Sequence, residues 1–211
     1  MGYTWGVLTE SSGIFIVPDN QNHKNGLTAL PFHLPSSRAV TGTDVASFRE
    51  WFGLSVDECR VILGIPTSSW YKITMDEAEQ PLKDPAIALL IRYYARHPDE
   101  VPFLPTAEVQ EIEEILQDIP MCYWGILLGR ESASGHRWTS KHHHFKPVTA
   151  RLAYYLVQNA RKDPNYLQHW KEDLVNVEAT ARGVENIWSS GSWNPKRGAK
   201  TRRTTKLVRK R

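Results

Sequence analysis

The stretch GLSVDECRVILGIPTSSWYKI, residues 53–73, decides the fold predicted for this chain. It contains SVDE at 55–58, and a Ser followed three residues later by Glu is typical of a capping box, in which each side chain bonds a backbone N–H at a helix start. Gly64 then suits the left-handed residue that ends a helix. Pro66 and Thr67 suit the first turn of the next helix. The stretch therefore predicts two short helices joined by a tight turn.

Helical patterns also stand on both sides of this stretch. Upstream, TDVASFREWF at 43–52 places apolar residues with helical spacing, at Val45, Phe48, Trp51 and Phe52. Downstream, PAIALLIRYY begins at Pro85, and proline is favoured in the first turn of a helix. Together these segments predict a unit of helices built around the turn at Gly64.

The same arrangement occurs a second time in the chain. GRESASGHRW at 129–138 aligns with GIPTSSWYKI at 64–73, and both follow a short apolar segment that ends in Leu-Gly. The helices opened by proline also align, with matched positions Pro85/Pro147, Ala88/Ala150, Leu90/Leu152 and Tyr93/Tyr155. The offset is 65 residues in the first half and 62 in the second. Matches at two offsets that differ only by a loop three residues shorter in the second copy indicate an internal repeat. We name residues 41–105 unit one and residues 106–170 unit two.

The first helix of unit two is predicted from TAEVQEIEEILQDI at 106–119. Its apolar residues, Val109, Ile112, Ile115 and Leu116, share one face of a helix. The connection between the units, RHPDEVPFLPT at 96–106, is short and contains three prolines. We therefore expect the two units to be held in a fixed relation.

A helix, a Gly-Leu-Ser start, a Leu-Gly end and a short Ser/Thr-rich helix together resemble the lambda-repressor-like (Cro/repressor-type) helix-turn-helix domains. Residues 53–73 carry the closer match and residues 118–138 the looser one. The resemblance implies a mainly α fold with two helix-turn-helix units in tandem. It also implies a sequence-specific protein of double-stranded DNA, in which the second helix of each pair lies in the major groove. Tandem domains with a basic tail resemble transcription regulators of plasmids, phages and conjugative elements.

By this resemblance the reading helices span 66–73 and 131–138. Hydroxyl groups contact bases or phosphates, and Lys or Arg reaches guanine O6 and N7. The candidates for base readout are Thr67, Ser68, Lys72, Ser132, His136 and Arg137. Ala133 is also expected to face DNA, and Tyr71 is a phosphate candidate. Trp70, Ile73 and Trp138 are predicted to pack in the core.

Unit two departs from the pattern at two positions. Gly135 takes the place of Trp70, which predicts a lower helix propensity, by about 1 kcal/mol, and the loss of a core side chain. Glu131 at the start of the reading helix would repel phosphate unless it accepts from cytosine N4. Unit two is therefore predicted to be a distorted reader.

Charge is distributed unevenly along the chain. Residues 196–211 hold nine Lys and Arg and no acid, whereas the other 195 residues hold 17 basic and 23 acidic groups. Such a cationic tail is usually disordered and binds polyanions, with a solvated end as the alternative. We predict a flexible tail over 191–211. Its phosphate candidates are Lys196, Arg197, Lys200, Arg202 and Arg203.

The two units also differ in charge. Unit one has six basic and ten acidic residues, and the segment TMDEAEQ after its reading helix is expected to be an acidic loop. Unit two has seven of each, but residues 130–146 hold four Lys or Arg, four His and one acid. The phosphate candidates here are Arg130, Lys141, His142, His143, His144 and Lys146. The charge distribution favours unit two as the phosphate-binding unit. The closer helix-turn-helix match favours unit one as the unit that contacts bases.

The three consecutive histidines at 142–144 admit three interpretations. In a loop flanked by Lys141 and Lys146 their N–H groups suit a sugar-phosphate backbone. A metal site with His136 and Cys122 has suitable ligand types, but adjacent histidines diverge and no paired Cys or His spacing accompanies them. A solvated loop is the third interpretation. We predict no metal and no cofactor.

Several function classes find little support in the residues. No P-loop, dinucleotide fingerprint or Gly-x-Ser-x-Gly motif is present, so we expect no enzyme. The two cysteines, Cys59 and Cys122, cannot build a disulfide framework, and Cys59 is expected in the core. No apolar run reaches the roughly 20 residues needed to cross a bilayer. We expect no export signal, no membrane and a bacterial cytoplasmic, nucleoid-associated protein.

The remaining segments are predicted from local signals. Residues 1–40 form an N-terminal arm with a short β-hairpin around ESSG. Residues 171–190 form an extra helix with Leu174, Val177 and Ala181 on one side, or a packing arm.

The expected partner is double-stranded DNA. One chain should act as an intramolecular pseudo-dimer on two unlike half-sites in successive major grooves, about 34 Å apart. A homodimer, RNA polymerase and other DNA-bound proteins are left open as further partners. Two alternatives remain: an accessory protein of a relaxosome or origin, and a protein-interaction adaptor with degenerate helix-turn-helix units.

Overall fold

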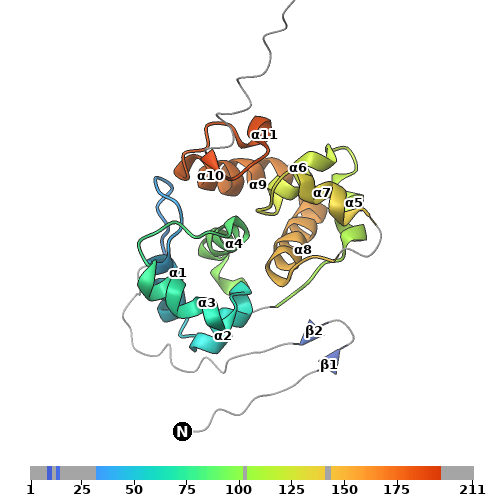
Figure 1. The fold of residues 1–211 in the computed structure, drawn as a ribbon. Coiled ribbons are helices and arrows are strands. Elements are labelled where there is room, and N and C mark those ends of the chain that lie inside the picture. The colour runs from blue at the N-terminus through green and yellow to red at the C-terminus, as the bar shows by residue number, and fades with distance from the viewer. Residues whose placement is uncertain (1–8, 11–12, 15–31, 102–103, 141–143, 196–211) are drawn as a thin grey trace, which may run out of the picture.

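The computed structural model describes residues 9–10, 13–14, 32–101, 104–140 and 144–195, and within them the protein is mainly helical (Figure 1). This confirms the mainly α fold class. Strands β1 (Thr9–Glu10) and β2 (Gly13–Ile14) pair antiparallel, with Thr9 opposite Ile14, where the short hairpin was predicted. The rest of the arm through residue 31 lies outside the described residues. None of the described helices is both long and apolar enough to span a bilayer.

Unit one forms five helical segments before the connection to unit two. Val45 and Phe48 of the first helix are fully buried, as the apolar spacing predicted. The segments are α1 (Gly42–Trp51), α2 (Val56–Leu63), α3 (Thr67–Tyr71), the π-helical η1 (Lys72–Asp76) and α4 (Pro85–Arg96), followed by the 3₁₀ turn η2 (Pro98–Glu100).

Unit two repeats this order. Its first helix buries Val109, Ile112 and Leu116, the face predicted from the sequence. Its last helix begins at Pro147, which is matched to Pro85 at the start of α4. The helices are α5 (Val109–Leu116), α6 (Met121–Leu127), α7 (Ala133–Trp138) and α8 (Pro147–Lys162).

The segment after unit two is helical too, but it differs from the expectation. Residues 166–181 run without a break, so the division expected at residue 170 falls inside a helical segment. The parts are α9 (Tyr166–Trp170), the π-helical η3 (Lys171–Asn176) and α10 (Val177–Ala181), followed by α11 (Ile187–Ser190). Leu174 is buried as expected, but Val177 and Ala181 are only half-buried, and Val175 and Glu178 are buried in their place.

Glu178 explains this change of face. Its side chain is fully buried, and its carboxylate accepts from Arg92 Nε at 2.7 Å and from Arg182 Nε at 2.8 Å. Arg92 in turn donates to the carbonyls of Pro35 and Arg38. A buried charge is tolerated only where it is paired and hydrogen-bonded in this way. The ion pair therefore joins α10 to α4 and to the segment that precedes α1.

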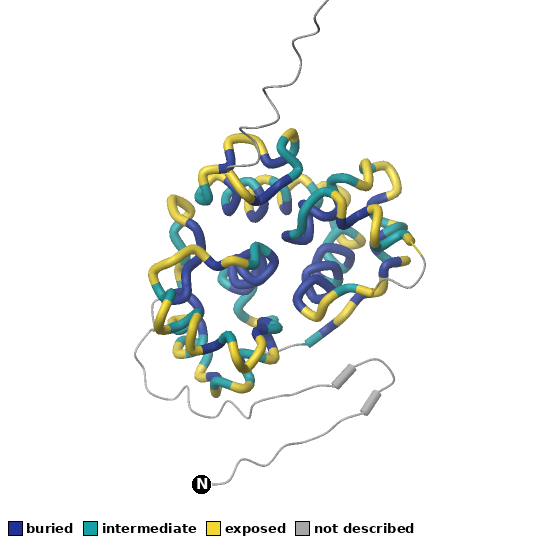
Figure 2. The backbone as a smooth tube through the Cα atoms, in the orientation of Figure 1, coloured by how far each residue is buried: buried dark blue, intermediate teal, exposed yellow. Residues whose placement is uncertain are grey.

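The two units pack on each other through their last helices, α4 and α8. Tyr93 and Tyr155, which occupy matched positions of the repeat, stack with ring centroids 4.3 Å apart and an angle of 24° between the planes. The hydroxyl groups of Tyr94 and Tyr155 lie 3.2 Å apart in a hydrogen bond. Figure 2 shows α4 and α8 as the most continuously buried segments of the molecule. The core of the protein thus includes the junction between the units.

Contacts of the turn glycines are reciprocal between the units. A Cβ on Gly64 would lie 3.4 Å from Val148, and a Cβ on Gly129 would lie 2.4 Å from Cα of Ala86. Gly64 and Gly129 are matched positions, and Ala86 and Val148 are matched by the offset of 62. Each turn glycine thus contacts the residue matched to the one that the other glycine contacts, and such an exchange of matched contacts is the property of a twofold axis. The junction is therefore pseudo-twofold.

Figure 1 is drawn roughly along this axis. α4 and α8 lie side by side at the centre, with α1, α2 and α3 on one side and α5, α6 and α7 on the other. The helical segment 166–190 covers one end of the pair. Both short helices, α3 and α7, consequently stand at the periphery, on opposite sides of the junction.

Candidate nucleic-acid interface

The turn between α2 and α3 has the geometry that its residues predict. Ser55 Oγ accepts from the backbone N–H of Glu58 at 3.2 Å, and the Glu58 carboxylate accepts from the N–H of Ser55 at 2.7 Å. Gly64 ends α2 with a φ of 65°, a left-handed conformation that only glycine adopts without strain. The N–H of Ile65 then bonds the carbonyl of Arg60 at 2.9 Å. The predicted cap and turn are confirmed.

α3 presents its polar side chains outward. Thr67, Ser68, Tyr71 and Lys72 are exposed, with 66% of Tyr71 accessible, whereas Trp70 is buried in the core. Trp70 and the half-buried Ile73 thus take the core positions predicted for them. The base-readout candidates of unit one are therefore accessible, with Thr67 and Ser68 at the start of α3 and Lys72 just after its end.

Two of these candidates already have partners. The Thr67 hydroxyl accepts from Arg60 Nη2, whose guanidinium also pairs with Asp57. Lys72 Nζ lies 3.7 Å from the carboxylate of Glu77. Both side chains are exposed, and the exposed Lys72–Glu77 pair contributes little net free energy, so Lys72 can exchange it for a ligand.

The helix that carries these residues is longer than expected. It continues as η1 to Asp76, so the expected acidic loop begins only at Glu77. The Thr74 hydroxyl donates to the carbonyl of Trp70 at 3.0 Å, a bond that extends the helical path. α1 packs closely here, because a Cβ on Gly42 would lie 1.8 Å from the carbonyl oxygen of Ile73. Local sequence does not reveal this tertiary contact, which packs the extension against α1.

In unit two, Gly135 has a different role from the one predicted. A Cβ on Gly135 would lie 1.9 Å from the carbonyl oxygen of Met121, and a Cβ on Gly125 would lie 2.2 Å from that of Glu131. Gly135 therefore brings the backbone of α7 into contact with the start of α6, and Gly125 of α6 contacts the backbone just before α7. Gly135 is buried at this contact. The side chain expected to be missing from the core here is therefore replaced by close backbone packing.

The start of α7 is covered by the C-terminal segment. The N–H of Ser132 donates to the carbonyl of Gly191 at 3.0 Å, and Ser132 itself is half-buried. The buried Trp193 donates from Nε1 to the carbonyl of Arg130 at 3.2 Å. We name residues 190–193 the C-terminal cover. Ser132 is therefore covered, whereas the other two base-readout candidates of unit two, His136 and Arg137, are exposed. Ala133 is exposed as well.

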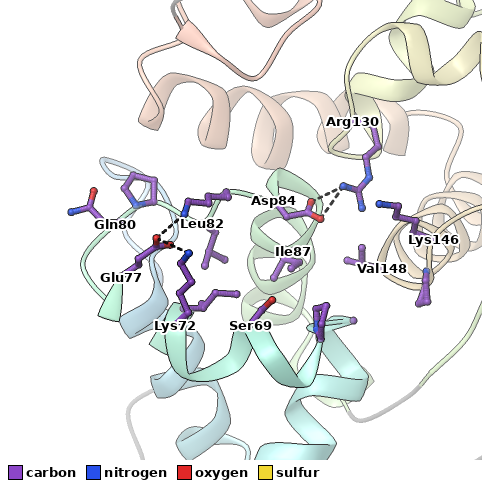
Figure 3. Close-up of a pocket in the computed structure, with 16 residues that line it drawn as sticks. Ser69, Lys72, Glu77, Gln80, Leu82, Asp84, Ile87, Arg130, Lys146 and Val148 are labelled. Carbon is purple, nitrogen blue, oxygen red and sulfur yellow. Dashed lines mark hydrogen bonds and ion pairs between the residues drawn. The ribbon is translucent and has the colours of Figure 1, made fainter. Parts of the chain in front are cut away.

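Arg130 is the phosphate candidate that the structure places inward. Its Nη1 donates to both carboxylate oxygens of Asp84, at 2.8 and 2.9 Å (Figure 3). Its Nε donates to the hydroxyl of Thr149 at 2.9 Å. The guanidinium therefore ties unit two to the start of α4. The sequence could not reveal this pair, since Asp84 is 46 positions away and its proximity to Arg130 depends on the packing of the units.

The remaining phosphate candidates divide by location. His144 is exposed just before α8, and Lys146 is exposed at the first cap position of that helix. The others lie outside the described residues: Lys141, His142, His143, Lys196, Arg197, Lys200, Arg202 and Arg203. Within the described part of the chain, no three His, Cys, Asp or Glu side chains are grouped so that they could hold a metal ion.

Burial affects the pKa values of two titratable groups in unit one, Cys59 of α2 and Asp44 of α1. Burial raises the pKa of Cys59 to about 12, so its thiol stays protonated in the core, where it was predicted to lie. Burial would also raise the pKa of Asp44, but hydrogen bonds from Arg38 at 2.6 and 2.7 Å and from the N–H of Thr41 outweigh it and lower the pKa. Asp44 thereby anchors the start of α1 as a carboxylate.

Comparison of the whole chain with protein-family models, with curated proteins and with solved structures gives no match.

Proposed function

We propose that this chain is a double-stranded DNA-binding protein that carries two helix-turn-helix units as an intramolecular pseudo-dimer. The observation that carries the proposal is the reciprocal junction of the units, in which Tyr93 stacks on its matched residue Tyr155. Paired helix-turn-helix units meet DNA through twofold symmetry, because the duplex backbone has the same symmetry. A single chain with this junction presents α3 and α7 as a pair without a second copy.

Surface chemistry supports the same proposal. The exposed side chains of α3 and α7 include hydroxyl, ammonium, imidazole and guanidinium groups, which suit base edges and phosphates. The basic tail at 196–211 adds nine cationic groups that suit the phosphate backbone without regard to sequence. On this basis we propose a bacterial transcription regulator of a mobile element, in the cytoplasm at the nucleoid. An accessory protein of a transfer origin would use the same interface.

The proposal is tested by selecting the duplexes that the protein binds from a random pool, and then footprinting the protein on the selected duplexes. We expect one chain to protect two successive major grooves, about 34 Å apart, with unlike half-sites. Deleting residues 196–211 should lower the affinity for all duplexes alike and reduce the slope of log K against log salt, by about 0.9 for each phosphate that the tail neutralises. Equal affinity for selected and scrambled duplexes at 0.15 M salt would contradict sequence-specific binding.

One observation favours a second candidate, the protein-interaction adaptor. Tyr71 and Met75 are 66% and 69% exposed and stand four residues apart, on one face of the helix formed by α3 and η1. Aromatic and Met side chains are enriched in protein interfaces. If Tyr71→Ala leaves the affinity for a selected duplex unchanged, this face is free to bind a protein.

A further inference from the structure

A cleft lies between the two units, beside the start of α8. It has a volume of about 400 Å³ and is bounded by α3 and η1, by the loop 77–84, and by residues 146–148 (Figure 3). Cavities of this size at the boundary of two structural units are typical of small-molecule sites. Because both units supply its walls, the volume exists only while they stay in their paired arrangement.

The floor of the cleft is apolar. Leu82, Ile87 and Val148 are 4%, 6% and 4% exposed, and Figure 3 places them between the two sides of the cleft. Ile73 lines it as well and is partly buried. Such a floor binds the hydrocarbon or aromatic body of a ligand, at roughly 25 cal/mol for each Å² of apolar surface removed from water.

Cationic groups stand on both sides of this floor. On one side the ammonium groups of Lys72 and Lys83 share a single carboxylate, Glu77, at 3.7 and 2.7 Å. On the other side Arg130 pairs with Asp84, and Lys146 makes no ion pair within the described residues. Four cations thus face two carboxylates, so each side of the cleft keeps one uncompensated positive charge.

The start of α8 adds to this positive potential. α8 is 16 residues long, and its first cap residue, Lys146, contributes no side-chain hydrogen bond to the first amides. At the start of α4, by contrast, Asp84 accepts from the N–H of Ala86 at 2.9 Å. First-turn N–H groups and the dipole of a helix this long favour an anion at its start.

We propose that the cleft binds a small organic anion with an apolar body, held by Lys72 and Lys146 over the floor of Leu82, Ile87 and Val148. The carboxylate, sulfonate or phosphate group takes the uncompensated charge, and the apolar body covers the floor. Since the ligand touches both units, it stabilises their paired arrangement. The cleft shares Lys72 and Lys146 with the proposed DNA interface, but binding of the anion does not require DNA.

The experiment uses the full chain and 1-anilinonaphthalene-8-sulfonate, a fluorescent aromatic anion, as the probe. We expect saturable binding of one probe per chain, displaced by phenyl phosphate but not by the same concentration of benzyl alcohol, which is neutral. The variant Lys72→Ala/Lys146→Ala should weaken binding at least tenfold, which corresponds to about 1.4 kcal/mol. The control Lys162→Ala, an exposed lysine at the far end of α8, should bind within twofold of the wild type.

Circular dichroism melting of each variant establishes that the fold is kept, because all three lysines are exposed. The proposal is overturned if the wild type shows no saturable binding, or if both variants bind as the wild type does. It is also overturned if benzyl alcohol competes as well as phenyl phosphate, which would mark an apolar pocket without anion selectivity. Displacement by a DNA duplex but not by phenyl phosphate would assign the cleft to the nucleic-acid backbone instead.

Discussion

The two units have the same order of helices but differ in what covers their turns. In unit one the start of α3 is open, with Pro66, Thr67 and Ser68 all exposed. In unit two the start of α7 lies under the C-terminal cover, where Ser132 bonds Gly191. Since a reading helix contacts bases with its first residues, this difference assigns base readout to unit one within the proposed function. Unit two would then hold the DNA backbone and support its partner unit.

The largest expected effect tests the junction itself, through the matched glycines. Gly129→Ala adds a Cβ that would lie 2.4 Å from Cα of Ala86, at a residue with a φ of 70°. Left-handed strain and overpacking together should lower the free energy of unfolding by about 4 kcal/mol. Gly64→Ala, with its nearest atoms at 3.4 Å, should cost only the strain, about 1–2 kcal/mol.

Urea denaturation of the two variants measures both values. Gly183→Ala is a control for strain alone, because its φ is 76° and its Cβ would meet nothing within 4 Å. Equal losses in all three variants would show that Gly129 does not pack against α4 as described.

A second test removes the C-terminal cover from unit two. Trp193 is 5% exposed and bonds the carbonyl of Arg130, so Trp193→Ala should lower the free energy of unfolding by about 3 kcal/mol. The amide of Ser132 should also lose protection from hydrogen exchange, since its acceptor is Gly191. The amide of Ile65, bonded within unit one to Arg60, is the matched internal control. Unchanged protection at Ser132 would mean that the cover does not depend on Trp193.

Part of this structure was predictable from the sequence. Local chemistry predicted the capping box at Ser55, the end of α2 at Gly64, and helices that begin at Pro85 and Pro147, because each depends on residues within one turn. The repeat predicted that two similar units exist. It also indicated Tyr93 and Tyr155 as matched positions, although not that they would stack on each other.

The rest depends on contacts between segments far apart in the chain. The burial of Glu178 requires Arg92, and the inward position of Arg130 requires Asp84. Gly135 looked like a weak point of its helix, because helix propensity does not register the close approach of α6. The cover on Ser132 could not be inferred, since nothing near residue 191 indicates where that loop packs. The candidate interface was therefore predictable in its helices but not in its accessibility.

A third test compares the proposed readers on a selected duplex. Ser68→Ala and Lys72→Ala should each weaken binding by about 1–3 kcal/mol and relax the preference at one base position, if they contact bases. Arg137→Ala, in unit two, should weaken binding to all sequences equally and by less than about 1 kcal/mol, as a phosphate contact does. Titrations against single-base variants of the duplex measure both effects. A base preference altered only by Arg137→Ala would reverse the assignment of the units.

The smallest expected effect concerns the two residues that contact Tyr93 from matched positions. His97, at the end of α4, stacks on the Tyr93 ring at 4.4 Å, and Asn159 of α8 donates to the Tyr93 hydroxyl at 3.0 Å. Burial lowers the pKa of His97, Arg96 lowers it further and Glu100 opposes the change. The neutral ring therefore contributes stability above the unfolded pKa of about 6.5, and this contribution is lost as the pH falls toward the lower pKa of the folded state.

His97→Asn gives unit one the residue of unit two and removes this titration. Between pH 7.5 and pH 5 the wild type should lose more free energy of unfolding than the variant, while above pH 7.5 the difference between them should be constant. Urea denaturation at four or more pH values measures the difference. The exposed His169→Asn serves as the control and should follow the wild type. If the wild type and His97→Asn lose free energy of unfolding in parallel, the fold does not hold His97 neutral. The difference between His97 in unit one and Asn159 in unit two would then affect only the packing on Tyr93.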